Sequence, residues 1–138
     1  MALEVALRAL GIGAGDEVIT TPFTWISTAE TIALVGARPV FADIEADTYN
    51  IDPREVEKRI TAKTKAIIAV NLFGQMADYT ALEAIAEKHG LKIIEDAAQS
   101  FGAEQNTRKS GTVGAVSCTS FFPAKPLGAY GDGGAVFT

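Results

Sequence analysis

The sequence is poor in the residues that build metal centres and disulfide frameworks. It contains one cysteine, Cys118, and one histidine, His89, in 138 residues. A single cysteine cannot form an internal disulfide bond, and the apolar run around Cys118 is typical of a small core residue. His89 precedes Gly90 at a predicted helix end, where a cation complements the helix dipole. Because no clustered cysteine and histidine spacing is present, the sequence does not indicate a metal site.

Basic clusters and long apolar runs are also missing. The net charge is -5, and the 12 lysines and arginines do not gather in one segment, which argues against nucleic acid and anionic membranes as partners. No apolar run approaches the length of a membrane span, and no signal-peptide pattern is present. We therefore expect a cytoplasmic protein of one domain, with no nucleic-acid or membrane partner.

The sequence does show an alternation of strands and helices. The segment 65–72 is almost continuously apolar, as expected for a strand buried on both faces of a parallel sheet. The other predicted strands are residues 17–20, 39–44, 92–95, 115–122 and 134–138, and helices are predicted at residues 1–10, 27–36, from 53 onward and 78–90. Residues 105–114 are predicted to form a polar loop. The pattern predicts a three-layer α/β fold with a mainly parallel sheet.

Capping signals mark the ends of several predicted helices. Asp52 followed by Pro53 is typical of a helix start, with the aspartate as N-cap and proline at the first helical position. Ser27 with Glu30 three residues later fits a capping box. Gly90 is predicted to end the helix that Asp78 starts.

Lys125 lies in an unusual segment, between two prolines and after two phenylalanines in residues 120–128. An ammonium among apolar and rigid neighbours tends to lose its proton, and a neutral amine attacks an aldehyde to form a Schiff base. The alternative interpretation is a solvated lysine in a loop before a hairpin.

Asp96 ends a short apolar segment that is predicted to be a buried strand. In a doubly wound sheet the carboxyl ends of the strands are where ligands bind, so Asp96 would face a ligand crevice. A carboxylate there can pair with the protonated pyridine nitrogen of a pyridoxal ring. The alternative is that Asp96 and Gln99 form a helix capping box. A ring-facing acid and a Schiff-base lysine are expected together, so the pair is more specific than either residue alone.

Four sequence blocks, two of which contain Asp96 and Lys125, carry a resemblance to a known family. They are residues 15–30, 72–75, 95–103 and 120–134, in this order. On these blocks the chain resembles the large domain of a pyridoxal-phosphate-dependent sugar aminotransferase of the DegT/DnrJ/EryC1/StrS family. The resemblance implies the fold of the large domain of fold-type I pyridoxal-dependent transferases.

The same resemblance implies that residues 1–138 are a partial large domain. In the family, a strand and a Gly-Thr turn that holds the cofactor phosphate precede the first helix, and a smaller domain follows the large one. We expect both to lie outside these residues. The last strand would pair with the missing first one, leaving an open sheet edge.

The resemblance also implies roles for five residues. Lys125 would form the Schiff base with pyridoxal phosphate and move a proton, Asp96 would pair with the pyridine nitrogen, and Gln99 would contact the ring or its oxygen. Trp25 would stack on the ring face, and Ser120 would bind the phosphate. From the residues alone, the alternatives are a core tryptophan for Trp25 and an ordinary strand serine for Ser120.

The implied reaction is transamination of a nucleotide-linked keto sugar, with glutamate as amino donor and 2-oxoglutarate as its product, in amino-sugar biosynthesis. Lysine at position 125 indicates transamination, because a family branch with histidine there performs dehydration. Pro126 resembles the branch that acts at C3 of nucleotide-linked N-acetyl keto-uronic acids, and Gln75 is placed near the substrate. The family's sites lie at a subunit interface, which implies a homodimer.

Two interpretations of another class remain open. One is a non-catalytic, truncated aminotransferase fragment that folds without binding the cofactor properly. The other is a Rossmann-like nucleotide-binding module, although no predicted strand is followed by the G-x-G-x-x-G fingerprint.

Overall fold

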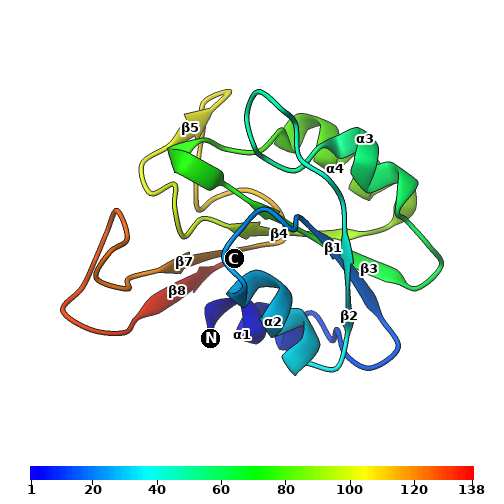
Figure 1. Cartoon of the computed structure of the whole chain (residues 1–138), viewed down its shortest axis with the longest axis horizontal. Coiled ribbons are helices and arrows are strands. Elements are labelled where there is room, and N and C mark those ends of the chain that lie inside the picture. Colours follow the sequence, from blue (N-terminus) through cyan, green and yellow to red (C-terminus); the bar gives the residue numbers. More distant parts are fainter.

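A six-stranded sheet forms the centre of the structure, a computed structural model that describes residues 1–138 (Figure 1). The strand order is β2-β1-β3-β4-β7-β8. Neighbouring strands are parallel, except that β7 and β8 are antiparallel. The strands are β1 (Glu17–Thr20), β2 (Arg38–Phe41), β3 (Thr64–Val70), β4 (Lys92–Asp96), β7 (Val116–Ser120) and β8 (Gly134–Phe137). The predicted α/β fold with a mainly parallel sheet is confirmed.

Two helices cover each face of this sheet, giving the three predicted layers (Figure 1). The helices are α1 (Ala2–Ala9) and α2 (Ser27–Leu34) on one face, and α3 (Pro53–Lys58) and α4 (Tyr79–His89) on the other. Successive residues of a strand point to opposite faces. Ile67 of β3 therefore packs with Val56 and Leu82 of α3 and α4, whereas Ile68 packs with Leu7 and Ile32 of α1 and α2. No helix combines the length and apolar character that crossing a membrane requires.

The predicted ends of α3 and α4 are confirmed. Asp52 accepts a hydrogen bond from the Arg54 amide at 2.8 Å, with Pro53 at the first helical position. Asp78 caps α4 in the same way. Gly90 ends α4 in the left-handed conformation, with φ of 67°, which glycine adopts without steric cost.

The capping box predicted at Ser27 is wrong. Ser27 is the first residue of α2 rather than its cap, and Ile26 occupies the cap position with no side-chain cap bond. The preceding turn takes over this role, because the carbonyl of Trp25 accepts from the Thr28 amide at 3.2 Å. Backbone bonds from the turn thus satisfy the first-turn amides that a serine cap would otherwise satisfy.

The predicted loop at residues 105–114 contains a short hairpin. Its strands are β5 (Glu104–Gln105) and β6 (Arg108–Lys109), joined by Asn106 and Thr107 at φ of 50° and 65°. Such a turn favours glycine, so a threonine there hides the hairpin from sequence patterns. Arg108 holds the hairpin to α4 through two hydrogen bonds with Glu83, at 2.6 and 2.7 Å.

The packing on β3 gives a stability prediction. Replacing fully buried Ile67 with alanine should lower the free energy of unfolding by about 2–5 kcal/mol, because a cavity remains between β3 and its helices. Leu34→Ala, on the exposed side of α2, should change it by no more than about 0.5 kcal/mol. Urea unfolding followed by circular dichroism measures both, and equal losses in the two variants would contradict this packing.

Candidate active site

Asp96 is the last residue of β4, at the edge of the sheet where the parallel strands end. Its side chain is 6% exposed and lies on the face covered by α1 and α2. The Thr28 hydroxyl donates to Oδ2 at 3.1 Å, and the Ala98 amide donates to Oδ1 at 3.2 Å. No helix begins after β4, so the alternative of a capping box with Gln99 is wrong. The chain makes a turn instead, and Asp96 holds that turn.

The pKa of Asp96 lies above its ordinary value of 3.8. Burial is the largest cause, because it disfavours the charged form. The Ala98 amide, the Thr28 hydroxyl and the positive charge of Lys125 act in the opposite direction and lower this pKa. Lys125 is therefore near enough for its charge to act on Asp96, although the two residues make no direct ion pair.

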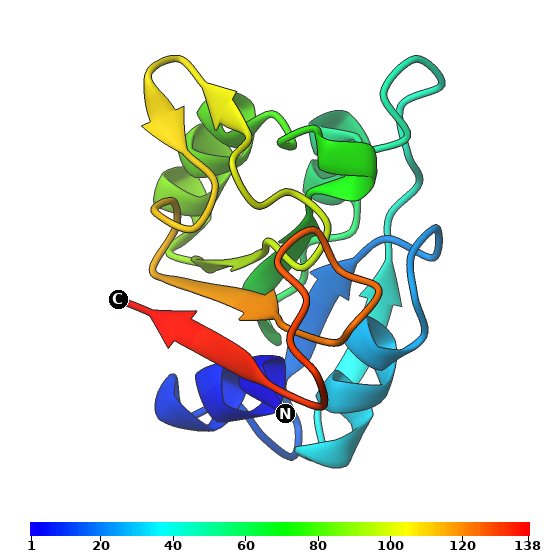
Figure 2. The same cartoon turned by 90° about the vertical axis from the view of Figure 1, so that its left-hand side faces the viewer.

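Lys125 lies in the loop between β7 and β8, which Figure 2 shows in orange and red. Its side chain is half-buried, and its amide donates to the Phe122 carbonyl at 2.8 Å. The loop closes tightly at Gly128, where an added Cβ would lie 2.4 Å from the Pro123 carbonyl oxygen. Only glycine allows this approach, so the turn around Lys125 depends on it.

Ser120, the last residue of β7, begins this loop. Its hydroxyl accepts a hydrogen bond from the Phe122 amide at 3.2 Å, and its backbone pairs with Gly134 of β8. The side chain is half-buried, so the hydroxyl also remains within reach of a ligand. Because β7 pairs with β4, Ser120 belongs to the same sheet edge as Asp96.

Trp25 lies in the turn before α2 and is 74% exposed, so the alternative of a core tryptophan is wrong. Trp25 lies three residues before Thr28, whose hydroxyl donates a hydrogen bond to Asp96. Gln99 is half-buried in the turn after β4. The structure thus places Trp25, Asp96, Gln99, Ser120 and Lys125 on segments that follow or flank the strand ends, and their roles toward a cofactor stay predictions.

The sequence did not reveal Glu95 as the centre of a buried network. Its side chain is fully buried on the face opposite Asp96, and its carboxylate makes no ion pair. It accepts five hydrogen bonds of 2.7 to 3.3 Å: from Asn71 Nδ2, Ser110 Oγ, the Gly111 amide to both oxygens, and the Val113 amide. The available signal was a second acid beside Asp96, directly after the apolar pair Ile93 and Ile94.

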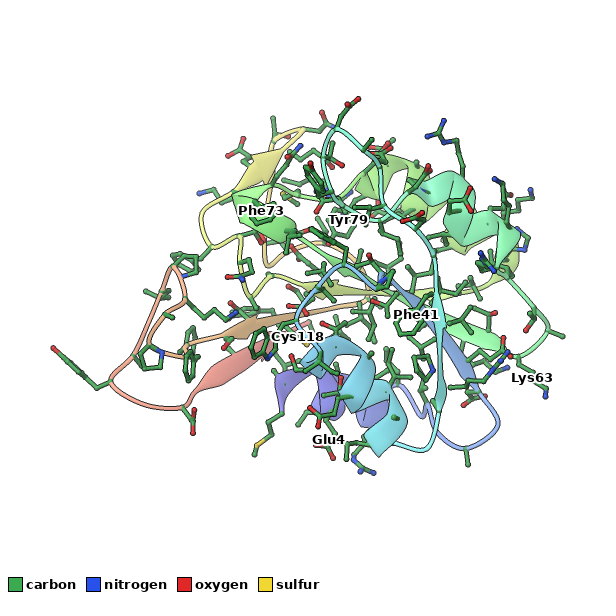
Figure 3. The ribbon with its side chains drawn as sticks, in the orientation of Figure 1. Glu4, Phe41, Lys63, Phe73, Tyr79 and Cys118 are labelled. Carbon is green, nitrogen blue, oxygen red and sulfur yellow. The ribbon has the colours of Figure 1, made fainter.

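Asn71 extends this network toward α4. Its Oδ1 accepts from the Tyr79 hydroxyl at 2.8 Å and from the Ala77 amide at 3.1 Å. Tyr79 is the first residue of α4 and is 1% exposed; Figure 3 labels it. Burial, with the negative charges of Glu95 and Asp96, raises the pKa of Tyr79 well above 10.0. The phenol therefore stays protonated and remains a hydrogen-bond donor.

Neighbouring acids on β4 thus differ in how fully they are satisfied. Five hydrogen bonds occupy the carboxylate of Glu95, whereas two reach that of Asp96. An ionised carboxylate has roughly four acceptor sites, so Asp96 keeps capacity for a further donor. Glu95 is saturated by the protein, and Asp96 is the one suited to bind a ligand.

Other features do not compete for this site. Two surface hollows of about 520 and 560 Å³ lie where β1, β2 and β3 begin, at the edge of the sheet opposite Asp96. Cys118 is buried as predicted, and burial, with the charge of Asp96, raises its pKa to about 12. The thiol is therefore protonated and unreactive. No group of three or more histidine, cysteine or acidic side chains is arranged to hold a metal.

The raised pKa of Asp96 predicts a pH-dependent stability change. The folded chain holds this proton more tightly than the unfolded chain, so ionisation of Asp96 favours unfolding as the pH rises through its folded pKa. Asp96→Asn should therefore be more stable than the native chain at pH 7, and the gain should vanish below about pH 3.8. Urea titrations across this range measure it, with exposed Asp47→Asn as control. A gain that is independent of pH would contradict the prediction.

The hydrogen bonds to Glu95 predict that neutralising this acid, unlike Asp96, destabilises the fold. Glu95→Gln places an NH₂ group against amide donors, and should lower the free energy of unfolding by about 1–3 kcal/mol because buried donors lose their acceptor. Hydrogen exchange at Gly111 and Val113 should accelerate, since both amides donate to Glu95. Exposed Glu104→Gln is the matched control. Unchanged exchange at these two amides would show that Glu95 does not hold this segment.

Comparison with known proteins identifies the family. The chain is 59% identical over 137 residues to UDP-2-acetamido-2-deoxy-3-oxo-D-glucuronate aminotransferase of Pseudomonas aeruginosa, covering 99% of this chain and 38% of that protein. It therefore spans about two fifths of this curated relative's length.

Solved structures of other proteins are also similar to this chain. DesV of S. venezuelae, in complex with a ketimine intermediate, superposes with a TM-score of 0.96 at 47% identity, over 99% of this chain and 37% of DesV. NtdA of Bacillus subtilis, with bound cofactor PMP, gives 0.91 at 35% identity, over 99% of this chain and 31% of NtdA. These neighbours confirm the fold-type I architecture. The profile of the DegT/DnrJ/EryC1/StrS aminotransferase family matches residues 1–138, and the chain belongs to that family.

Proposed function

We propose that this chain provides the pyridoxal-phosphate-binding part of an enzyme that transaminates a nucleotide-linked keto sugar. The observation that carries the proposal is the buried Asp96 carboxylate, which accepts only two hydrogen bonds from the protein. A buried carboxylate with unused acceptor capacity favours a cationic N–H donor, and a protonated pyridine ring is such a donor. The solved relative with bound PMP supports the same cofactor class.

The residues present fit this cofactor. Asp96 would hold the proton on the pyridine nitrogen, and Thr28 and Ala98 would keep its carboxylate oriented. The exposed indole of Trp25 offers a free face for a ring. Ser120 would donate its hydroxyl to the phosphate. Bound pyridoxal phosphate would supply an electron sink for charge that develops on the substrate carbon.

Lys125 would have two tasks. Its amine would hold the cofactor at the aldehyde carbon, and the same amine would carry the proton that moves between the substrate and cofactor carbons. The half-buried setting between prolines limits the positions that the side chain can adopt. Gln99, in the turn that Asp96 holds, would contact the ring or its oxygen.

For the substrate, we propose a UDP-linked N-acetyl keto-uronic acid aminated at C3. The Pseudomonas aeruginosa relative is named for such a sugar, and Pro126 after the lysine is consistent with that branch. Glutamate as amino donor, 2-oxoglutarate as product and a homodimeric assembly belong to the same proposal.

Cofactor addition tests the proposal directly. Pyridoxal phosphate added to the chain should give a visible absorbance band from the lysine adduct, and borohydride reduction followed by mass mapping should place the label on Lys125. Lys125→Ala should lose both the band and the label. Lys63→Ala removes an exposed lysine at the other side of the molecule (Figure 3) and should retain them.

Two results would count against the proposal. Labelling spread over exposed lysines, unaffected by Lys125→Ala, would show adventitious reaction with aldehyde. Absence of any band in a folded chain would favour the non-catalytic interpretation. Asp96→Asn should retain the lysine but hold the cofactor more weakly, because the ring nitrogen loses its anionic partner.

A further inference from the structure

Three exposed aromatic rings form a continuous cluster beside the candidate site. Phe23, Tyr49 and Phe73 come from three separate segments and are 45%, 46% and 73% exposed. The rings of Phe23 and Tyr49 are stacked at 5.5 Å between centroids, and Tyr49 meets Phe73 edge-on at 6.2 Å. The cofactor proposal uses none of these rings.

Two members of the aromatic cluster (Phe23, Tyr49 and Phe73) have strained backbones. Tyr49 has φ of 59° and Phe73 has φ of 55°, a left-handed conformation that bulky side chains rarely adopt. Such strain persists only where surrounding contacts impose it, and it concentrates at ligand-binding positions. The chain thus gives up stability to present two neighbouring rings to solvent.

Asn50 imposes this arrangement. Its side chain is buried, and its Oδ1 accepts from the Leu72 amide at 3.0 Å while its Nδ2 donates to the carbonyls of Gln75 and Met76 at 3.2 Å. Asn50 directly follows Tyr49, and Leu72 and Gln75 bracket Phe73. One buried amide therefore locks together the two strained segments, so the rings are held in place before any ligand arrives.

The aromatic cluster adjoins the proposed cofactor site on two sides. Phe23 is two residues from Trp25, in the same turn. Phe73 precedes Gly74, where an added Cβ would lie 3.9 Å from the Gln99 carbonyl oxygen. Figure 3 shows Phe73 on the side of the molecule that carries the β5–β6 hairpin. Phe41, another exposed phenylalanine, lies on β2, away from Phe73.

We propose that the aromatic cluster stacks the pyrimidine base of the nucleotide-linked sugar. The inference deepens the proposed function and rests on it. A sugar that presents its keto carbon to Lys125 would direct its nucleotide toward the surface, and the aromatic cluster offers rings there beside Trp25 and Gln99. Phe73 meets Tyr49 edge-on and is largely exposed, which leaves ring surface free for a flat base. The Pseudomonas aeruginosa relative is named for a UDP-linked sugar.

Nucleotide binding without cofactor tests this site. In NMR titrations with UDP, the aromatic resonances of Tyr49 and Phe73 should shift saturably, and the uracil protons should receive saturation from the protein. Inorganic pyrophosphate, which lacks the base, should shift neither ring. Phe73→Leu should weaken UDP binding by about tenfold, the scale expected for loss of one stacking ring. The control Phe41→Leu should bind UDP normally.

Phe73→Gly separates binding from folding. Glycine adopts the left-handed conformation freely, so this variant should keep or raise the urea midpoint while it loses UDP affinity. Loss of both would indicate a packing role and overturn the proposal. Equal effects of UDP and pyrophosphate, or no saturable UDP shift, would also overturn it.

The rival occupant is a second copy of the chain. If sedimentation shows self-association that Phe73→Leu abolishes, and UDP binding does not depend on Phe73, the cluster is an interface between copies and the proposal fails. Because UDP is added without pyridoxal phosphate, these results are independent of the lysine adduct. A chain that forms the adduct but ignores UDP retains the proposed chemistry and loses only this base-stacking site.

Discussion

The buried carboxylate of Glu95 is the interaction on which the site's geometry depends. It binds the end of β3 through Asn71 and the segment before β7 through Ser110, Gly111 and Val113. The strands β3 and β7 are the two that flank β4 in the sheet. With an acid enclosed by donors at this junction, β4 can adopt one register, and that register places Asp96 on the opposite face. The segment that Glu95 binds leads into β7, which ends at Ser120 and continues into the loop that carries Lys125.

The two neighbouring carboxylates of β4 therefore differ in role: one stabilises the fold, and the other is available to a ligand. Glu95 is satisfied by the protein alone, because donors surround its carboxylate. Asp96 has two donors and a raised pKa, so its ionised form is destabilising in the isolated chain. A cationic ring nitrogen would relieve that cost. The aromatic cluster would follow the same arrangement, since Tyr49 and Phe73 hold strained conformations that the proposed base stacking would use.

Much of the architecture was predictable from local signals. Apolar segments such as 65–72 and caps such as Asp52 and Gly90 depend on neighbouring residues, and their positions are confirmed. The capping box at Ser27 failed because the backbone of Trp25 satisfies the helix start, and the β5–β6 hairpin was missed because its turn lacks glycine. Thr28 bonds Asp96 across 68 positions of sequence. Contacts of that separation, like the five bonds to Glu95, arise from the packed fold and leave no periodic pattern in a single sequence.

The single cysteine has a practical consequence. Cys118 is enclosed between β4 and β8, opposite Asp96 in the sheet register, and its pKa of about 12 keeps the sulfur as a thiol. Alkylating reagents attack thiolates, so the native chain should resist them until β7 separates from its neighbours. The rate at which iodoacetamide modifies Cys118 thus reports how often the sheet opens at β7, the strand that leads to the Lys125 loop. Intact mass spectrometry measures this rate without any engineered label.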